Sequence, residues 1–152
     1  MNKKVIYLFA VLVLPVLAKA DSYPTELGTF VVQNSDCSTL FESGNLKNAL
    51  SHCITEAKNG SVTASEILSK IYAVKGALLD YSKALKWAKI ASEKGSVNSQ
   101  AMLGLMYLRG EGTEKDVKKA QHYIQLAIDN GHKGALQLRK LMKRAGLWQK
   151  ST

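Results

Sequence analysis

Three histidines and two cysteines are the side chains of this sequence best suited to metal binding or catalysis. The histidines are His52, His122 and His132, and none stands at a metal-ligand spacing such as His-x-x-x-His. The sequence also lacks the Gly-x-Ser-x-Gly and Ser-x-x-Lys motifs of activated serine nucleophiles. We therefore expect no catalytic residue, no metal site and no cofactor, and we predict that the protein is not an enzyme.

Two glycines in "RGEGTEK", Gly110 and Gly112, precede a lysine and raise the possibility of a phosphate-binding loop. The stretch lacks the glycine and lysine spacing of a P-loop, and no predicted strand precedes it. Glycine accepts positive φ, and Asp116 is placed to cap a following helix. The pattern therefore predicts a corner between two helices.

The first twenty residues have the pattern of a secretory signal peptide. Lys3 and Lys4 precede an uncharged run over residues 5–18, and Ala18-Lys19-Ala20 resembles a cleavage site. The alternative is an uncleaved anchor, but a membrane-spanning helix needs roughly 17 to 25 apolar residues, and Pro15 interrupts this run. We expect cleavage after Ala20 and export, to the bacterial periplasm or otherwise into the medium.

Residues 21–152 have the length of one small domain. Residues 1–20 contain three lysines and no acid, so the net charge falls from +9 to +6 when they are removed. Residues 21–35 match nothing further along the chain, and Pro24 and Gly28 indicate an extended segment.

The chain repeats itself. Residues 61–95 align with residues 96–131 when one extra residue is allowed in the second loop. The aligned pairs are Ser61/Ser96, Val62/Val97, Leu68/Leu103, Tyr72/Tyr107, Asp80/Asp116, Lys83/Lys119, Ala84/Ala120, Ala91/Ala127 and Gly95/Gly131. Residues 36–60 form a degenerate upstream copy that ends at Gly60, and residues 132–152 begin another copy and stop.

Apolar spacing divides each copy into two helices. Small residues such as Ala84 and Ala120 let the helices approach, and we assign Met102 and Met106 to the core. The sequence therefore predicts an all-α fold, a short α-solenoid of antiparallel helix pairs with about two full repeats, a degenerate N-terminal pair and a C-terminal capping helix.

The stretch "LGLMYLRGEGTEKDVKKAQHYIQLAIDNGH" resembles a Sel-one-like repeat, a relative of the tetratricopeptide repeats. The resemblance rests on Leu103, Gly104, Tyr107, Gly110, Gly112, Asp116, Lys119, Ala120, Tyr123, Ala127 and Gly131. Residues 61–95 depart from the pattern, with Ser69 in place of Gly104 and Lys75 in place of Gly110, and Ser99 stands where the family usually has alanine. The resemblance implies a stack of helix pairs that acts as an adaptor or scaffold for other proteins.

The two cysteines fit the predicted first hairpin. If this hairpin turns at Gly44-Asn45, Cys37 lies about eight residues before the turn and Cys53 about eight after it, side by side on antiparallel helices. Export to an oxidising compartment favours a structural disulfide. A redox pair is the alternative, but the sequence lacks Cys-x-x-Cys.

Two functional hypotheses follow. In the first, the first helices of the repeats form a groove that binds another protein, with candidate contacts at Lys70, Tyr72, Leu105, Tyr107 and Arg109. In the second, the basic C-terminal helix makes a peripheral contact with an anionic membrane or cell-wall polymer. Its candidate contacts are Arg139, Lys140, Lys143 and Arg144.

The C-terminal helix also has a simpler interpretation. Its apolar residues Leu138, Leu141, Met142 and Trp148 are placed to cover the last repeat, and this capping role is favoured over membrane binding. Nucleic acid is not an expected partner, because the protein is predicted to be exported and its basic residues lack interleaved aromatic side chains.

Overall fold

The computed structural model describes residues 36–148. The chain divides into two units, residues 1–35 and 36–152, and the second is the one described here. The predicted signal peptide (1–20), the predicted extended segment (21–35) and Lys150 of the basic tail all lie outside the described residues.

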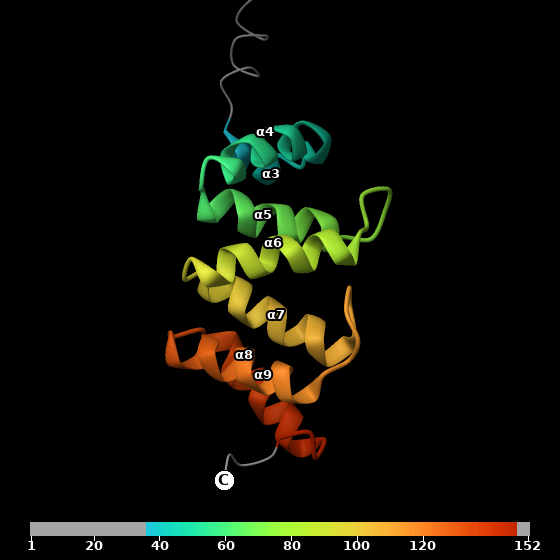
Figure 1. The fold of residues 1–152 in the computed structure, drawn as a ribbon, viewed down its shortest axis with the longest axis vertical. Coiled ribbons are helices and arrows are strands. Elements are labelled where there is room, and N and C mark those ends of the chain that lie inside the picture. Colours follow the sequence, from blue (N-terminus) through green and yellow to red (C-terminus); the bar gives the residue numbers. More distant parts are fainter. Residues whose placement is uncertain (1–35, 149–152) are drawn as a thin grey trace, which may run out of the picture. The chain divides into compact units, whose positions relative to one another are not determined.

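Helices alone make up the regular structure of residues 36–148, and they pack as successive hairpins (Figure 1). They are α3 (Cys37–Glu42), α4 (Leu46–Lys58), α5 (Val62–Ala73), α6 (Tyr81–Glu93), α7 (Val97–Arg109), α8 (Val117–Asp129) and α9 (Lys133–Arg144). The most extensive packing joins α5 to α6 and α7 to α8, the two helices of each predicted repeat. The predicted all-α solenoid is confirmed.

Side-chain caps determine where these helices begin. The side chains of Ser61, Asp80, Ser96 and Asp116 each accept a hydrogen bond from the backbone N–H three residues later, which satisfies a donor that the first turn leaves free. Because Ser61/Ser96 and Asp80/Asp116 are equivalent in the two repeats, the repeated sequence sets the same helix starts twice.

The loop after α7 is a corner, as predicted. The N–H of Gly110 donates to the carbonyl of Met106 at 2.8 Å, and Gly110 has a φ of 76°. Gly112 has a φ of 72°, and a Cβ there would collide with the backbone of Tyr81. The N–H of Asp116 donates to the carbonyl of Tyr107 at 2.8 Å and closes the corner.

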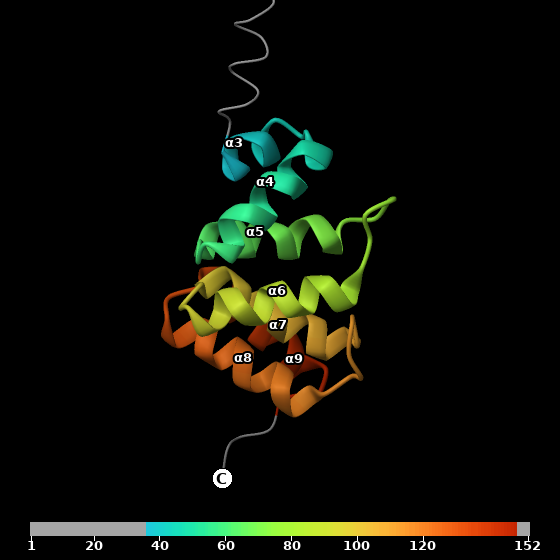
Figure 2. The ribbon, with the colours of Figure 1, turned by 45° about the horizontal axis from the view of Figure 1, so that its top comes forward.

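The preceding loop, residues 74–80, closes in the same way although it lacks the first of these glycines. The N–H of Asp80 donates to the carbonyl of Tyr72 at 2.8 Å. Figure 2 shows this loop and the loop at residues 110–116 at the same end of their hairpins. The repeat therefore tolerates two loop sequences around one closing hydrogen bond.

The core alternates small and large side chains, as the spacing predicts. Ala84, Ala88, Ala120 and Ala127 are fully buried where helices approach, while larger side chains fill the space between them: Leu68, Ile71, Leu103, Met106 and Ile124. Met106 lies in the core, and Met102 is half-buried against it.

A disulfide joins Cys37 of α3 to Cys53 of α4, with 4.7 Å between the Cα atoms. Both cysteines are fully buried, and α3 also packs against α5. In addition, the N–H of Cys37 donates to Oε1 of Glu56 at 2.8 Å. A crosslink over this separation contributes about 3 kcal/mol, and here it holds a helix of only six residues.

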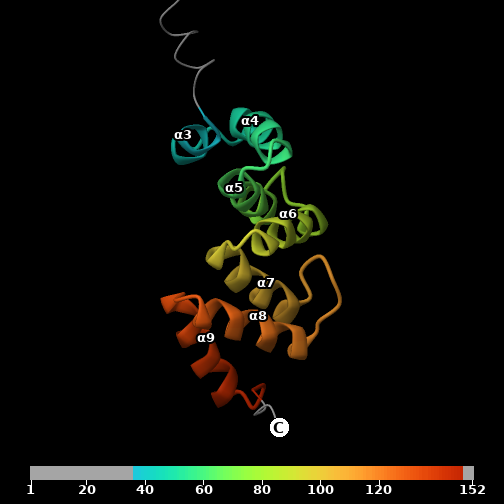
Figure 3. The ribbon, with the colours of Figure 1, turned by 60° about the vertical axis from the view of Figure 1, so that its left-hand side comes forward.

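Helix α9 packs against α8 at the end of the last repeat (Figure 3). Its Ala135 and Met142 side chains are buried, and Leu138 is half-buried. The prediction that Leu141 joins this covered face was wrong, since Leu141 is 58% exposed. One residue turns an α-helix by about 100°, so Leu141 and the buried Met142 face different directions. After α9 the chain folds back, and Nε2 of Gln121 donates to the carbonyl of Leu147 at 2.6 Å.

Within residues 36–148, no helix has the length and apolar character needed to cross a membrane.

Candidate protein-binding groove

The first helices of the repeats, α5, α7 and α9, line two hollows in the surface. One lies between α7 and α9 and has a volume of about 430 Å³. The other, of about 360 Å³, lies between α7 and the end of α5 with its following loop. Leu105 and Arg109 line both hollows, so α7 is the wall that they share.

The hollow between α7 and α9, called the α7–α9 groove below, is mainly apolar. Its principal lining residues are Ala101, Leu105 and Arg109 of α7 and Ala135, Leu138 and Leu141 of α9. Leu141 follows Leu105 by 36 residues, the repeat length, so the two leucines are equivalent positions on successive first helices. The exposure of Leu141 therefore follows from its place in the repeat.

Three of the five predicted groove residues, Lys70, Tyr72 and Tyr107, line neither of the two hollows. Tyr72 and Tyr107 are only 8% and 5% exposed, so the prediction that they are exposed members of the groove was wrong. Tyr107 stacks on Tyr123 of α8 with 5.6 Å between ring centroids. The Tyr72 ring lies within cation–π distance of Lys83 on α6, so both tyrosines contact the second helix of their own repeat.

Lys70, Leu105 and Arg109 lie at the surface of the first helices. Leu105 and Arg109 line the groove. The Lys70 side chain is 42% exposed, but its Nζ atom lies 2.6 Å from Oε1 of Glu66. Sequence reasoning missed Ala101 and Ala135, which lie in the groove because alanines on two facing helices leave space between them.

The repeated Asp, Lys and Tyr residues form one structural unit in each hairpin. Nζ of Lys83 lies 2.9 Å from Oδ2 of Asp80 and 5.3 Å from the Tyr72 ring centroid, a cation–π distance. In the second repeat, Nζ of Lys119 lies 3.4 Å from Oδ2 of Asp116 and 5.4 Å from the Tyr107 ring. The repetition of these residues reflects folding of the hairpin.

The pKa shifts in this unit agree with a capping role. The pKa of Asp80 is lowered, first by the backbone N–H of Lys83 and then by the Lys83 side chain. The pKa of Lys83 is raised by its hydrogen bond to Asp80. The backbone N–H of Lys119 likewise lowers the pKa of Asp116.

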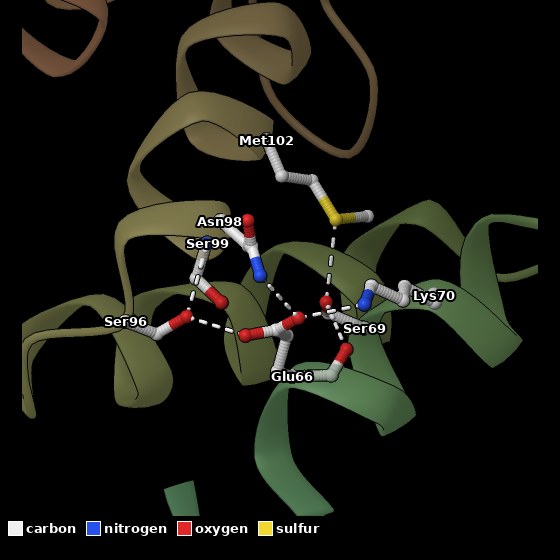
Figure 4. Close-up of polar contacts among 7 residues, drawn as sticks. All are labelled: Glu66, Ser69, Lys70, Ser96, Asn98, Ser99 and Met102. Atoms are coloured by element: carbon white, nitrogen blue, oxygen red, sulfur yellow. Dashed lines mark hydrogen bonds and ion pairs between the residues drawn. The ribbon is translucent and has the colours of Figure 1, made fainter. Parts of the chain in front are cut away.

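A second polar cluster, centred on Glu66 of α5, joins consecutive repeats (Figure 4). Oε2 of Glu66 accepts from Oγ of Ser96 at 2.7 Å, and Oε1 accepts from Nδ2 of Asn98 at 3.0 Å. Burial alone would raise the pKa of Glu66, but the hydrogen bonds from Lys70, Ser96 and Asn98 together lower it. All its oxygens are engaged, so the cluster fixes α5 against the start of α7.

The sequence model of the Sel1 repeat family matches residues 74–96 and 97–132. The matched residues include α6, α7 and α8, which are therefore similar to Sel1 repeats. The first match begins in the loop after α5, so it covers the loop and second helix of the predicted first repeat. The sequence of α5 explains why the match leaves out this helix, since Ser69 stands at the position of Gly104 in the next repeat.

A solved structure with the same repeat architecture is c5321, described as a protective antigen of uropathogenic Escherichia coli strains displaying an SLR fold. The sequence identity is 28% and the TM-score is 0.62, over 69% of this chain. The match spans 23% of c5321, so this chain corresponds to about a quarter of that protein. The resemblance and the fold inferred from the sequence are both confirmed. Sel1 repeat proteins typically serve as non-catalytic scaffolds for protein–protein interaction.

The three histidines lie on different elements: His52 on α4, His122 on α8 and His132 at the start of α9. Nδ1 of His132 accepts from the N–H of Ala135 at 3.0 Å and caps α9, while His122 packs edge-on against Tyr123. His52 is half-buried on α4. Among residues 36–148, no three side chains of the metal-binding types come together.

The predicted basic surface of α9 is only partly available. Nη1 of Arg139 donates to Oε1 of Gln125 at 3.2 Å, and the side chain is half-buried. Its contact with an anionic surface stays a prediction. Lys140, Lys143 and Arg144 are exposed, and so is Lys133. Within the described residues none of these four forms an ion pair.

Proposed function

We propose that the protein is an exported, non-enzymatic scaffold that binds a segment of another protein in the α7–α9 groove. The observation that carries this proposal is the pair of leucines at equivalent repeat positions, Leu105 and Leu141, on opposite walls of the hollow. Leu141 is 58% exposed and lines the hollow. An apolar groove between helices is a common way to bind a protein segment.

Site-specific photocrosslinking tests the groove. A photoreactive amino acid at Gln137, an exposed residue of the groove wall, should crosslink a discrete protein in the native envelope or secreted fraction. The same amino acid at Lys86, exposed on α6, is the matched control. Leu105→Ala with Leu141→Ala should abolish the Gln137 crosslink while the circular dichroism spectrum stays unchanged. Equal crosslinking from both positions would contradict the proposal.

The proposed export rests on residues 1–20 and has its own test. N-terminal sequencing of the protein from its native cell should find Asp21 as the first residue. A protein that retains Met1 and stays with the cytoplasmic fraction would contradict export and leave the groove proposal in place.

A second candidate function is contact with an anionic membrane or polymer. It is favoured by the exposed basic residues of α9 together with Leu136, which is 38% exposed. Co-sedimentation with phosphatidylglycerol vesicles, lost in Lys140→Gln/Lys143→Gln/Arg144→Gln, would support it. No sedimentation above that with phosphatidylcholine vesicles would eliminate the membrane contact.

A further inference from the structure

The α7–α9 groove joins an apolar floor to a positively charged rim. Its floor consists of alanine and leucine side chains from both helices. Arg109, whose side chain is 61% exposed, stands at one end of the groove. The carboxylate nearest to it is Glu111, which is 24% exposed and lies 3.5 Å away, so most of the Arg109 side chain still faces solvent.

The α9 side of the rim is basic for a reason of helical spacing. Lys133, Lys140 and Arg144 are separated by seven and four residues and so share one strip of α9. That strip adjoins the one containing Gln137 and Leu141, which line the groove. No acid occurs in residues 130–148, and none of the described residues that line the groove is acidic.

From this arrangement we infer that the partner segment is acidic: a stretch of another protein chain with at least two large apolar side chains and flanking Asp or Glu residues. The inference rests on the proposed function, and it adds the chemistry of the partner. Apolar side chains would occupy the space between Leu105, Leu138 and Leu141, while carboxylates would meet Arg109 at one end and Lys140 and Arg144 along one side.

The same residues fit a protein segment better than a lipid surface. The two exposed leucines of α9, Leu136 and Leu141, are five residues apart and so point about 140° away from each other. The strip of Lys133, Lys140 and Arg144 lies between them. A helix that lies in a membrane needs one continuous apolar face. The apolar surface of this groove instead has two walls, one from each helix, and is suited to surround a side chain.

Selection from a random dodecapeptide library displayed on phage, against the oxidised protein, tests the inference. The enriched peptides should carry net negative charge and at least two of Leu, Ile, Phe or Met. Synthetic copies should bind about tenfold less tightly to Leu105→Ala/Leu141→Ala and to Lys140→Gln/Arg144→Gln, and raising the salt concentration should weaken binding. Lys58→Gln/Lys86→Gln, which alters exposed lysines on α4 and α6, should bind as the unaltered protein does.

The possible results separate the inference from the proposed function. Enriched peptides that are neutral or basic, yet depend on Leu105 and Leu141, would overturn the acidic partner and leave the groove proposal intact. Failure to enrich any peptide that depends on these two leucines would overturn both.

The same experiment distinguishes other occupants of the groove. Phosphatidylglycerol vesicles that bind through Lys140 and Arg144, with no selected peptide in competition, would overturn the inference in favour of lipid. Peptide binding that appears only after removal of residues 21–35 would identify the chain's own segment as the occupant and would also overturn it. A dimer that dissociates in Leu141→Ala would do the same in favour of a second copy.

Discussion

Gly104 of α7 lies so close to Ile124 of α8 that a Cβ atom on Gly104 would stand 2.5 Å from Cγ1 of Ile124 and 3.3 Å from its backbone nitrogen. The preceding repeat has Ser69 and Ala88 at the equivalent positions, and both are fully buried. In the α7–α8 hairpin, the Ile124 side chain alone therefore fills the space between the two helices. In the α5–α6 hairpin, the smaller side chains of Ser69 and Ala88 share the equivalent space.

Gly104→Ala is expected to destabilise the protein by about 1 to 3 kcal/mol, because the added methyl overpacks the α7–α8 contact. Helix propensity alone predicts the opposite sign, since alanine is favoured over glycine by about 1 kcal/mol in a helix interior. Urea denaturation followed by circular dichroism measures the difference. A midpoint above that of the unaltered protein would show that Ile124 moves aside without cost.

A double-mutant cycle shows whether the two sites are coupled. Ile124→Ala alone should cost about 2 to 5 kcal/mol through the cavity it leaves. The double variant Gly104→Ser/Ile124→Ala copies the Ser69/Ala88 pair. Its loss of stability should be at least about 0.5 kcal/mol smaller than the summed losses of Gly104→Ser alone and Ile124→Ala alone. The serine hydroxyl can donate within its own helix, as Ser69 Oγ does to the carbonyl of Glu66 at 2.7 Å. Additive costs would contradict the shared space.

Ser99→Ala is expected to stabilise the protein. The Ser99 side chain is fully buried, and its Oγ has no hydrogen-bond partner among the described residues. A buried polar group left without a partner costs about 1 to 3 kcal/mol, and removing it should recover part of that. The measurement is the urea midpoint.

The matched control is Ser65→Ala. Ser65 is equally buried, but its Oγ donates to the carbonyl of Ser61 at 2.9 Å, so its loss should be neutral or destabilising. Equal effects at the two serines would show that the hydroxyl of Ser99 has a partner after all.

Cys37→Ala/Cys53→Ala is expected to lower the free energy of unfolding by about 3 kcal/mol. Amide hydrogen exchange should show which helix loses its structure first. Helix α3 has six residues and is too short to persist without the disulfide. Protection should fall first in residues 37–42 and remain in α7 and α8. Uniform loss along the described chain would instead mean that the disulfide stabilises the stack as a whole.

The period of the sequence repeat was enough to predict most of the fold, because each hairpin buries residues at the same repeat positions against its neighbours. Ser61/Ser96 and Asp80/Asp116 are caps that can be located by eye, and the cysteine pairing followed from hairpin geometry. These features depend on residues close together in the sequence, and the spacing of such residues was enough to predict them.

The errors arose where a residue's role depends on another helix. Tyr72 and Tyr107 were predicted to be exposed on the first helices, but both rings are buried, and each lies beneath a lysine of the second helix. Leu141 was grouped with Met142 by its apolar character, although the two face different directions. The Glu66 cluster was missed because its partners Ser96 and Asn98 are 30 and 32 residues away, with no motif to join them.

The Glu66 cluster predicts a dependence of stability on pH whose sign follows from its lowered pKa. The folded state holds Glu66 ionised below its ordinary pKa of 4.5. Its contribution is therefore fully present above pH 4.5 and is lost as the pH falls through the lower, folded value. Asp36, Asp80 and Asp116 also have lowered pKa values, so the unaltered protein loses stability from several groups in this range.

Glu66→Gln isolates the contribution of this one carboxylate. The variant should be less stable than the unaltered protein at pH 7, because Lys70 loses its ion pair and Ser96 and Asn98 lose a charged acceptor. The difference in melting temperature should narrow as the pH falls below 4. Glu114→Gln, at an exposed position without an ion pair among the described residues, is the control and should show no such narrowing. A constant Glu66→Gln deficit from pH 7 to pH 3 would assign the effect to packing, because a loss that depends on charge must fade once the carboxylate is protonated.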